Sequence, residues 1–350
     1  MHKLFNVAKI AFPRSLLTLC VISILALNSA CSLFGARTKI QVPQLLPMSN
    51  ADKSRLIQEV NKLSVLKSIH GKVDIEFEDT SFATAGIAEK YRQVDGTVTV
   101  QRPGKIYLII QFTFVDIAQM ASDGEHFAVA VLKGDDKYKR FVKGTNSAVY
   151  PKLAANGNGT EKKDNKQKGE KETVSALSNL RPQHLTDALM TRTIDAAAGF
   201  TYLQSEFFQE EPDNRPQAKK GARVMRGYYL LEELTAPQSG DLKILRRFWF
   251  DRANGIRLAR VQTYDDRGLL VTDVSYSDER PFGSNASVIL PSRVVITRPQ
   301  DQYKLRLTYQ DPTSVELDRE YRPEAFVLEN KWGLPEVDLD AQQKKVTANL

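Results

Sequence analysis

The stretch Gly96-Thr97-Val98-Thr99-Val100-Gln101-Arg102-Pro103-Gly104-Lys105-Ile106 decides the fold of this chain. Apolar and polar side chains alternate up to Gln101, which is the period of a strand with one buried face. Arg102-Pro103-Gly104 is then typical of a tight turn. A second apolar run continues over residues 106–114. Strand, turn and strand in this order predict an antiparallel hairpin.

The same signature recurs over most of the chain. Turn residues stand at Ser122-Asp123-Gly124, at 251–255 and at 265–268, between runs of alternating polarity. Regular short strands separated by such turns predict a meander. The predicted strands cover residues 69–78, 91–101, 106–114, 126–132, 138–142, 200–209, 223–234, 242–250, 257–264, 269–276, 288–296 and 303–309.

Two segments have a helical period instead. In residues 51–67 the apolar side chains recur at the spacing of an amphipathic helix, and Asn50 or Asp52 is placed to cap it. Residues 181–190, which begin with Arg181-Pro182, predict a second and shorter helix. The apolar stripe of the first helix is formed by Leu56, Ile57, Val60, Leu63 and Leu66.

These elements predict a mainly β chain with a few helices (α+β), built on one large curved antiparallel sheet or half-barrel closed by helices. A flat sheet of this many strands would twist, curl or split, so the sheet is expected to be curved. The helices must then lie against its apolar face. If the sheet curls around them incompletely, an apolar cavity remains between sheet and helices. Whether that interior is hollow or filled depends on how the helices pack, and both alternatives stay open.

The N-terminus predicts export and lipid attachment. A basic, acid-free start leads into the apolar run 16–27, and Asn28-Ser29-Ala30-Cys31 follows. The segment resembles a bacterial lipoprotein signal, so we expect residues 1–30 to be the signal peptide and Cys31 to be acylated. Two other interpretations remain: cleavage that leaves a soluble protein, and an uncleaved anchor, although the run is well short of the roughly 20 residues that span a bilayer.

Cysteine content and charge narrow the class of protein. The chain has two cysteines, and loss of residues 1–30 removes Cys20, so the mature chain would form no internal disulfide. The formal charge of +7 falls to +4 when Lys3, Lys9 and Arg14 leave with the signal. That balance supports weak attraction to anionic lipid headgroups at most. The sequence has no basic cluster interleaved with aromatic residues, which is the pattern expected of a protein that binds nucleic acid.

Two segments lack any clear period. Residues 31–50 carry Gly35, Pro43 and Pro47 and are interpreted as a tether. Residues 154–175 are expected to be a disordered polar insertion, because their centre is rich in Lys, Glu, Asn and Gly without a large apolar side chain. Either this insertion contacts phosphate headgroups or peptidoglycan, or it has no role of its own.

An ordered set of segments, each weak alone, carries a resemblance to a known family. The set comprises the first helix running into Ile69-His70-Gly71-Lys72-Val73, then residues 96–106, Ala121-Ser122-Asp123-Gly124, residues 250–255, Leu290-Pro291-Ser292-Arg293 and residues 309–326. In this order it resembles the family of LolA and LolB, the periplasmic carrier and the outer-membrane receptor of lipoprotein sorting, and RseB-like sensors. We expect one domain of this kind over residues 51–335, followed by a C-terminal tail over 336–350.

The resemblance implies a half-barrel with an apolar hollow that accepts acyl chains. The chain departs from LolA in its expected anchor, its polar insertion and its tail. Strand parity places a set of side chains inward, where they either line such a hollow or form ordinary core. This set is Leu108, Ile110, Phe127, Val129, Phe248, Phe250, Val261, Val274, Tyr276, Val294, Ile296, Leu305 and Leu307.

The sequence gives little support for catalysis, a cofactor or a metal site. The four histidines do not pair at metal-ligand spacing, and hydrolase, phosphate-loop and dinucleotide motifs are absent. Ser122, Asp123 and His126 lie close along the chain, but they belong to a predicted turn and the start of the next strand. We therefore expect no enzyme.

Two hypotheses on function follow. The first is a lipid-anchored cell-envelope protein that binds an acyl chain of a lipoprotein or lipid in an apolar cavity, in transport to the outer membrane. Ser32 after Cys31 favours the outer membrane, with the domain facing the periplasm. Its partners would be membrane lipid through acylated Cys31, the acyl ligand, and other lipoproteins or envelope proteins. The second is a non-catalytic interaction or sensor module that binds a protein partner and has a filled core.

Overall fold

The computed structural model describes residues 43–80, 89–90, 93–133, 136, 139–148, 150, 180–195, 199–235, 240–253, 255–284, 286 and 288–348. The predicted signal peptide, Cys31, most of the tether and the polar insertion at 154–175 lie outside these residues. Among the described residues, no helix combines the length and the apolar character needed to cross a membrane.

The chain divides into two compact units. The smaller comprises Met1–Gln44 and Pro212–Arg223. In it the backbone N–H of Asp213 donates to the carbonyl of Ala222 at 2.8 Å, and Arg215 donates two hydrogen bonds to the Asp213 carboxylate at 2.8 and 2.7 Å. The larger unit comprises Leu45–Glu211 and Val224–Leu350 and holds the elements that follow, apart from the terminal residues of three strands.

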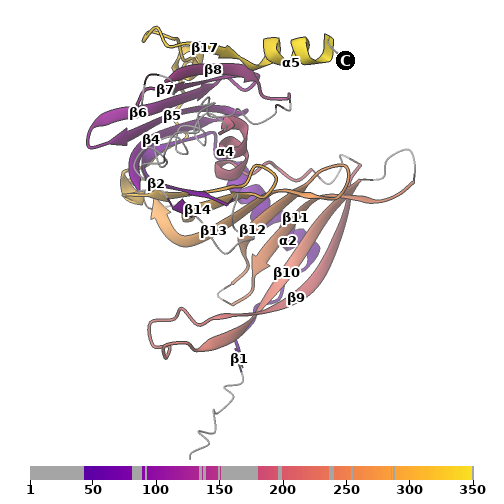
Figure 1. The fold of residues 1–350 in the computed structure, drawn as a ribbon. Helices are drawn as coiled ribbons and strands as arrows, with labels where there is room; N and C mark the ends of the chain where they lie inside the picture. Colours follow the sequence, from indigo (N-terminus) through magenta and orange to yellow (C-terminus); the bar gives the residue numbers. More distant parts are fainter. Residues whose placement is uncertain are drawn as a thin grey trace, which may run out of the picture. The chain divides into compact units, whose positions relative to one another are not determined.

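One open, curved sheet forms the larger unit (Figure 1). From β10 to β8 every pair in its order is antiparallel, whereas β17 runs parallel to β8. The order is β9 (Thr201–Pro212), β10 (Arg223–Thr235), β11 (Lys243–Asp251), β12 (Arg257–Tyr264), β13 (Leu270–Phe282), β14 (Val288–Arg298), β15 (Tyr303–Tyr309), β2 (Ser68–Asp79), β4 (Val94–Gln101), β5 (Lys105–Phe112), β6 (Val115–Ser122), β7 (His126–Val131), β8 (Arg140–Thr145) and β17 (Glu336–Asp338). Shorter strands are β1 (Gln44–Leu45), β3 (Glu89–Lys90) and β16 (Glu316–Leu317), the last two paired with β2.

The hairpin predicted around Arg102 is confirmed. β4 and β5 are antiparallel, with Gln101 opposite Lys105 and Val98 opposite Leu108. A second, long-range pairing completes the curve, because β15 lies beside β2 with Leu305 opposite Phe77. Strands from both ends of the chain are thus neighbours in the middle of the sheet.

Both predicted helices are present. α2 (Lys53–Ser64) begins after Asp52, whose side chain accepts a hydrogen bond from the N–H of Arg55 at 2.9 Å and caps the helix. α4 (Pro182–Leu189) begins with proline, which needs no hydrogen-bond partner for its nitrogen at this position. Shorter 3-10 turns and a third helix are η2 (Pro312–Ser314), η3 (Pro323–Phe326) and α5 (Leu339–Ala348).

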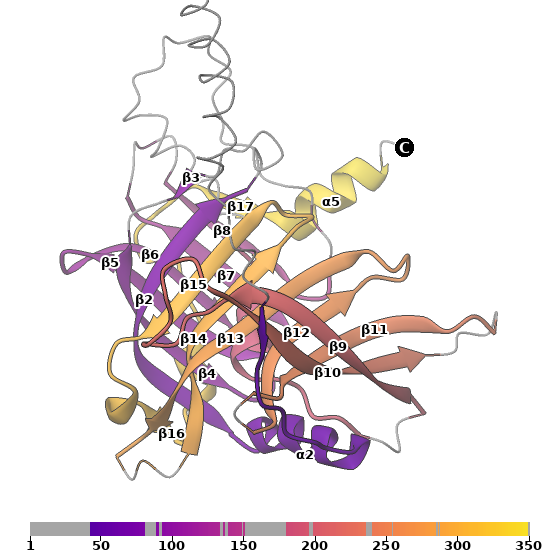
Figure 2. The same cartoon turned by 90° about the horizontal axis from the view of Figure 1, so that it is seen from below.

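The helices divide the inner side of the sheet between them. α4 lies inside the curve and contacts β5, β6 and β14, as Figure 1 shows. α2 contacts β12 and lies near β10 and β12 in Figure 2. The buried core is accordingly split, with one cluster around β2, β4–β7, β13–β15 and α4, and a second around α2, β10, β11 and β12.

Four features differ from the sequence-based expectation. The sheet is mixed rather than antiparallel, because β17 is parallel to β8. Closure of a half-barrel by the helices is not confirmed, since the sheet stays open at its outer strands. β6 was not predicted, and the expected tail contributes β17 and α5.

Candidate functional site

The inward-facing residues predicted from strand parity all lie among the described residues. Twelve are buried and Tyr276 is half-buried. They do not form one group but are divided between the two core clusters, and Tyr276 packs against both. The first cluster holds Leu108, Ile110, Phe127, Val129, Val274, Val294, Ile296, Leu305 and Leu307, and the second holds Phe248, Phe250 and Val261. Their assignment to a ligand cavity stays a prediction.

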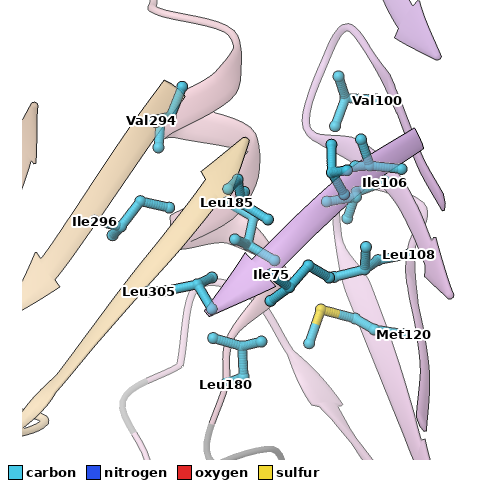
Figure 3. Close-up of a cluster of buried hydrophobic side chains, with 14 of the residues drawn as sticks. Ile75, Val100, Ile106, Leu108, Met120, Leu180, Leu185, Val294, Ile296 and Leu305 are labelled. Carbon is cyan, nitrogen blue, oxygen red and sulfur yellow. The ribbon is translucent and has the colours of Figure 1, made fainter. Parts of the chain in front are cut away.

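α4 occupies the concave side of the first cluster. Leu185 is fully buried, and Figure 3 shows it between the side chains of β14 and β15 on one side and those of β2 and β5 on the other. Leu180, Ala188 and Met190 are buried in the same cluster. Burying one leucine side chain contributes about 1.5–3 kcal/mol, so this face holds α4 mainly by apolar contact.

Polar contacts also join α4 and the residues beside it to the sheet. His184 Nδ1 lies 3.1 Å from the hydroxyl of Tyr303, and the hydroxyl of Tyr276 donates to the carbonyl of Ala188 at 2.9 Å. Burial, and then the positive charges of Arg298 and Arg181, lower the pKa of His184 well below its usual value. The imidazole is therefore neutral at physiological pH. Burial also raises the pKa of Tyr276 to about 12, so its phenol remains a donor.

Two arginines hold the ends of α4. The guanidinium of Arg181 lies 5.3 Å from the ring centres of both Phe127 and Tyr150, a cation–π arrangement at the start of the helix. Beyond its end, Arg102 donates to the carbonyl of Thr191 at 2.8 Å through Nη2. Its Nε donates to the carbonyl of Leu66 at 2.8 Å. Arg102 from the hairpin turn thereby connects the segments that follow α2 and α4.

A small apolar void lies where these segments meet β13, β14 and β15. Its volume is about 30 Å³, enough for a water-sized group but not for an acyl chain in this conformation. Of the predicted cavity residues it includes Tyr276 and Val294. Its full lining is Leu63, Leu66, Ile69, Leu189, Thr191, Tyr276, Phe282, Leu290, Pro291, Val294 and Tyr309.

Sequence reasoning missed the remaining residues of this void. Tyr309 ends a correctly predicted strand and shares the parity of Leu305 and Leu307, so the same rule extended by two residues would have found it. Leu63 and Leu66 were assigned to the helix stripe, which does not reveal that they face β13–β15. The contribution of helix ends to this lining had no signal in the sequence.

A separate cleft opens beside the exposed side of α4, and many of its lining residues have charged or polar side chains. It encloses about 630 Å³ and includes Arg102, Asp123, Gln183 and Arg192. Burial would raise the pKa of Asp123, but backbone N–H groups of His126 and Glu125 lower it below its usual value. These N–H groups donate to Asp123 at 2.7 and 2.8 Å, as expected of turn chemistry. Within the described ranges, no group of three or more His, Cys, Asp or Glu could hold a metal.

Comparison with known proteins gives matches only at the level of structure. A scan of protein-family models finds no match, and neither does a search of curated proteins. A LolA superfamily protein from Nitrosomonas europaea matches with a TM-score of 0.38 and 10% identity, over 80% of this chain and 99% of that one. A DUF1329 family protein from Desulfovibrio piger matches with a TM-score of 0.38 and 12% identity, over 80% and 96%.

A third solved structure is a domain assigned to outer membrane lipoprotein sorting in Vibrio parahaemolyticus. It matches with a TM-score of 0.37 and 13% identity, over 80% of this chain and 97% of that one. The first and the third of these structures are described by the family, or by the sorting role, of the proteins that the sequence resembles.

Proposed function

We propose that this chain is a lipid-anchored cell-envelope protein that binds a hydrophobic ligand on the concave face of its sheet, where the ligand takes the place of α4. The proposed ligand is an acyl chain of a lipoprotein or lipid, and the proposed role is transport of such molecules to the outer membrane. One observation carries the proposal: among the described residues, the apolar concave face formed by the first core cluster is covered by the short helix α4.

The physical reason lies in the length of α4. A helix of eight residues is too short to be stable alone, so its order depends on the contacts of Leu180, Leu185 and Met190 with the sheet. An acyl chain gains about 0.8 kcal/mol for each methylene that leaves water. Such a chain is therefore chemically suited to replace these side chains on the same surface.

The location rests on the sequence. In the proposal, Cys31 carries the acyl anchor and residues 31–50 span the distance to the domain at 51–335. Ser32 supports sorting to the outer membrane, with the domain facing the periplasm. Other lipoproteins or envelope proteins would be the source or destination of the ligand.

Ligand binding is tested on full-length protein that carries Cys31→Ser, which removes the proposed acyl anchor. Lipids extracted from the purified protein are identified by mass spectrometry, and a fluorescent fatty acid is titrated into it. We expect bound acyl lipid and saturable binding. Recovery of empty protein that also fails to bind the fluorescent fatty acid would contradict the proposal.

A second function is favoured by the packed interior. The void of about 30 Å³ beside Tyr276 fits a filled core, and hence an interaction or sensor module that binds a protein partner. Ile110→Trp separates the two, because Ile110 is 3% exposed on the concave face whereas Ile289, the matched control, is 60% exposed. Ligand binding is lost only in Ile110→Trp if the concave face is the site. A protein adduct that persists in crosslinked cells with Ile110→Trp supports the interaction module.

A further inference from the structure

The segment that connects β9 to β10 carries most of the net positive charge of the expected mature chain. Residues 213–223, named the basic connection below, hold four basic residues and one acidic residue, which gives a net charge of +3. The chain without residues 1–30 has a net charge of +4, so everything else in it contributes only +1. A charge gathered in so short a segment produces a local field that the balance of the whole chain does not reveal.

Two of the four basic side chains are left to interact with a partner outside the chain. Arg215 donates to the Asp213 carboxylate at 2.8 and 2.7 Å, so these two charges neutralise each other. Lys219 and Lys220 are exposed, and among the described residues no ion pair joins either ammonium to a carboxylate. The basic connection therefore presents two ammonium groups to the solvent.

A tight turn carries these two lysines. The N–H of Ala222 donates to the carbonyl of Lys219 at 2.9 Å, and Gly221, the third residue of the turn, has a φ of 79°. A positive φ at this position is typical of a type II turn and favours glycine. The N–H of Asp213 donates to the carbonyl of Ala222 at 2.8 Å and closes the connection. The two side chains thus start from a hydrogen-bonded backbone.

The expected tether joins the sheet at nearly the same place along β10. β1 is hydrogen-bonded to β10, and the N–H of Leu46 donates to the carbonyl of Met225 at 3.0 Å. Met225 comes two residues after the last residue of the basic connection. The fully extended chain from Cys31 to Gln44 spans at most about 45 Å. An acyl anchor at Cys31 would therefore keep the basic connection within reach of the bilayer surface.

An anionic bilayer surface is a partner that suits two exposed ammonium groups. Lysine binds phosphate as a point charge on a flexible stem, without the fixed bidentate geometry of a guanidinium. It can therefore follow headgroups that move laterally. The attraction acts over about one Debye length, which is about 10 Å at 0.1 M ionic strength. Two lysines alone bind a membrane weakly, but an anchor makes the contact intramolecular and so raises its occupancy.

We propose that the basic connection docks on anionic phospholipid headgroups through Lys219 and Lys220, and that this contact keeps the end of the tether at the bilayer surface. The contact rests on the proposed function, since the anchor at Cys31 supplies the membrane. It is separate from the concave face that takes the ligand, so the two can be tested independently.

The test is flotation of full-length Cys31→Ser protein with two kinds of vesicle, one of phosphatidylcholine alone and one that also contains phosphatidylglycerol. Residues 1–30 are present in every variant, so their own affinity for lipid cancels in the comparison. Lys219→Gln combined with Lys220→Gln should weaken binding to the anionic vesicles by about thirtyfold and leave binding to phosphatidylcholine unchanged. The difference should shrink at high salt.

Lys331→Gln combined with Lys344→Gln is the matched control, because it removes two exposed charges elsewhere in the chain. It should bind both kinds of vesicle like the parent. Equal losses in the two double variants would reflect overall charge and overturn the inference, and so would unchanged binding in the first of them. A parent protein that shows no preference for anionic vesicles would also overturn it.

Inorganic phosphate separates a headgroup surface from a discrete phosphate site. It should displace the parent protein from anionic vesicles no better than chloride at equal ionic strength, and stronger displacement by phosphate would contradict docking on a surface. Urea denaturation should give the same midpoint for both double variants and the parent, since the replaced side chains are exposed. Titration of a fluorescent fatty acid into the same proteins reports on the proposed function alone. Its failure in the parent would contradict ligand binding, whereas failure confined to the vesicles would contradict only the docking of the basic connection.

Discussion

His184 on α4 and Tyr303 on β15 are in hydrogen-bond contact, with 3.1 Å between Nδ1 and the hydroxyl. The two residues are 119 positions apart, so this contact ties the helix to the central strands of the sheet. It is one of the polar contacts that hold α4 on the concave face. If the ligand displaces α4, its binding must compete with this contact.

Tyr303→Phe should therefore raise the apparent affinity for an acyl ligand. Loss of one hydrogen bond loosens α4 by about 1 kcal/mol, which corresponds to about a fivefold gain in affinity. Titration of a fluorescent fatty acid measures the change. Hydrogen exchange of the α4 amides should become faster in parallel.

Tyr264→Phe provides the control, because it makes the same chemical change on β12, where the hydroxyl lies 3.3 Å from the side chain of Gln262. Its affinity should equal that of the parent protein. Equal affinities for both variants and the parent, together with faster exchange in Tyr303→Phe alone, would show that α4 and the ligand do not compete.

Leu185→Ala should reduce the free energy of unfolding by about 2–5 kcal/mol, because it leaves a cavity beneath α4. Leu203→Ala is the matched control on β9, where the side chain is 52% exposed. Its effect should be within about 0.5 kcal/mol. Urea denaturation measures both. Similar small losses in the two variants would mean that α4 adds little to the core.

The elements with clear turn chemistry could be predicted closely. β12 and β15 match their predicted ranges. β12, for example, lies between the turns at 251–255 and 265–268, whose Asp, Asn and Gly residues mark its two ends. β6 was missed for a specific reason. The turn before it uses Thr113 and Phe114 at positive φ of 47° and 66°, and neither residue type signals a left-handed backbone.

The parallel strand β17 had no signal of its own. It has three residues, Glu336, Val337 and Asp338, which is too short for a period to appear. Its pairing with β8 is supported by Lys143, whose ammonium lies 3.1 Å from Glu336 and 3.8 Å from Asp338. Contacts of this kind depend on the folded chain and cannot be read from spacing.

The candidate site could be predicted only in part. Strand parity identified buried positions correctly except at Tyr276, which is half-buried, because alternation decides which face a side chain occupies. It could not divide those positions between two clusters, since that depends on where α2 and α4 lie on the sheet. Nor could it find that the hydroxyl of Tyr309 lacks a hydrogen-bond partner among the described residues, which depends on the packing around it.

Acylation at Cys31 should be visible in cells grown with an alkyne fatty acid. The parent protein should acquire the label and partition with membranes, whereas Cys31→Ser should do neither, because the thiol is the proposed attachment point. Cys20→Ser, which lies in the expected signal, is the control and should be labelled normally. Label retained in Cys31→Ser would place any lipid elsewhere.

The stability of the protein should fall in mild acid through His184. Its pKa is lowered in the folded state by burial and by Arg298 and Arg181, so below the ordinary value of 6.5 the unfolded chain binds the proton more readily. The stabilisation is fully present above about pH 6.5 and is lost as the pH falls towards the folded-state pKa, at no more than about 1.4 kcal/mol per pH unit.

Denaturation of His184→Gln at the same pH values isolates this contribution, since glutamine keeps a hydrogen-bonding group towards Tyr303 but does not titrate. The slope of unfolding free energy against pH should be smaller in this variant between about pH 6.5 and pH 5. Identical slopes would mean that the imidazole of His184 is protonated as easily in the folded protein as in the unfolded chain.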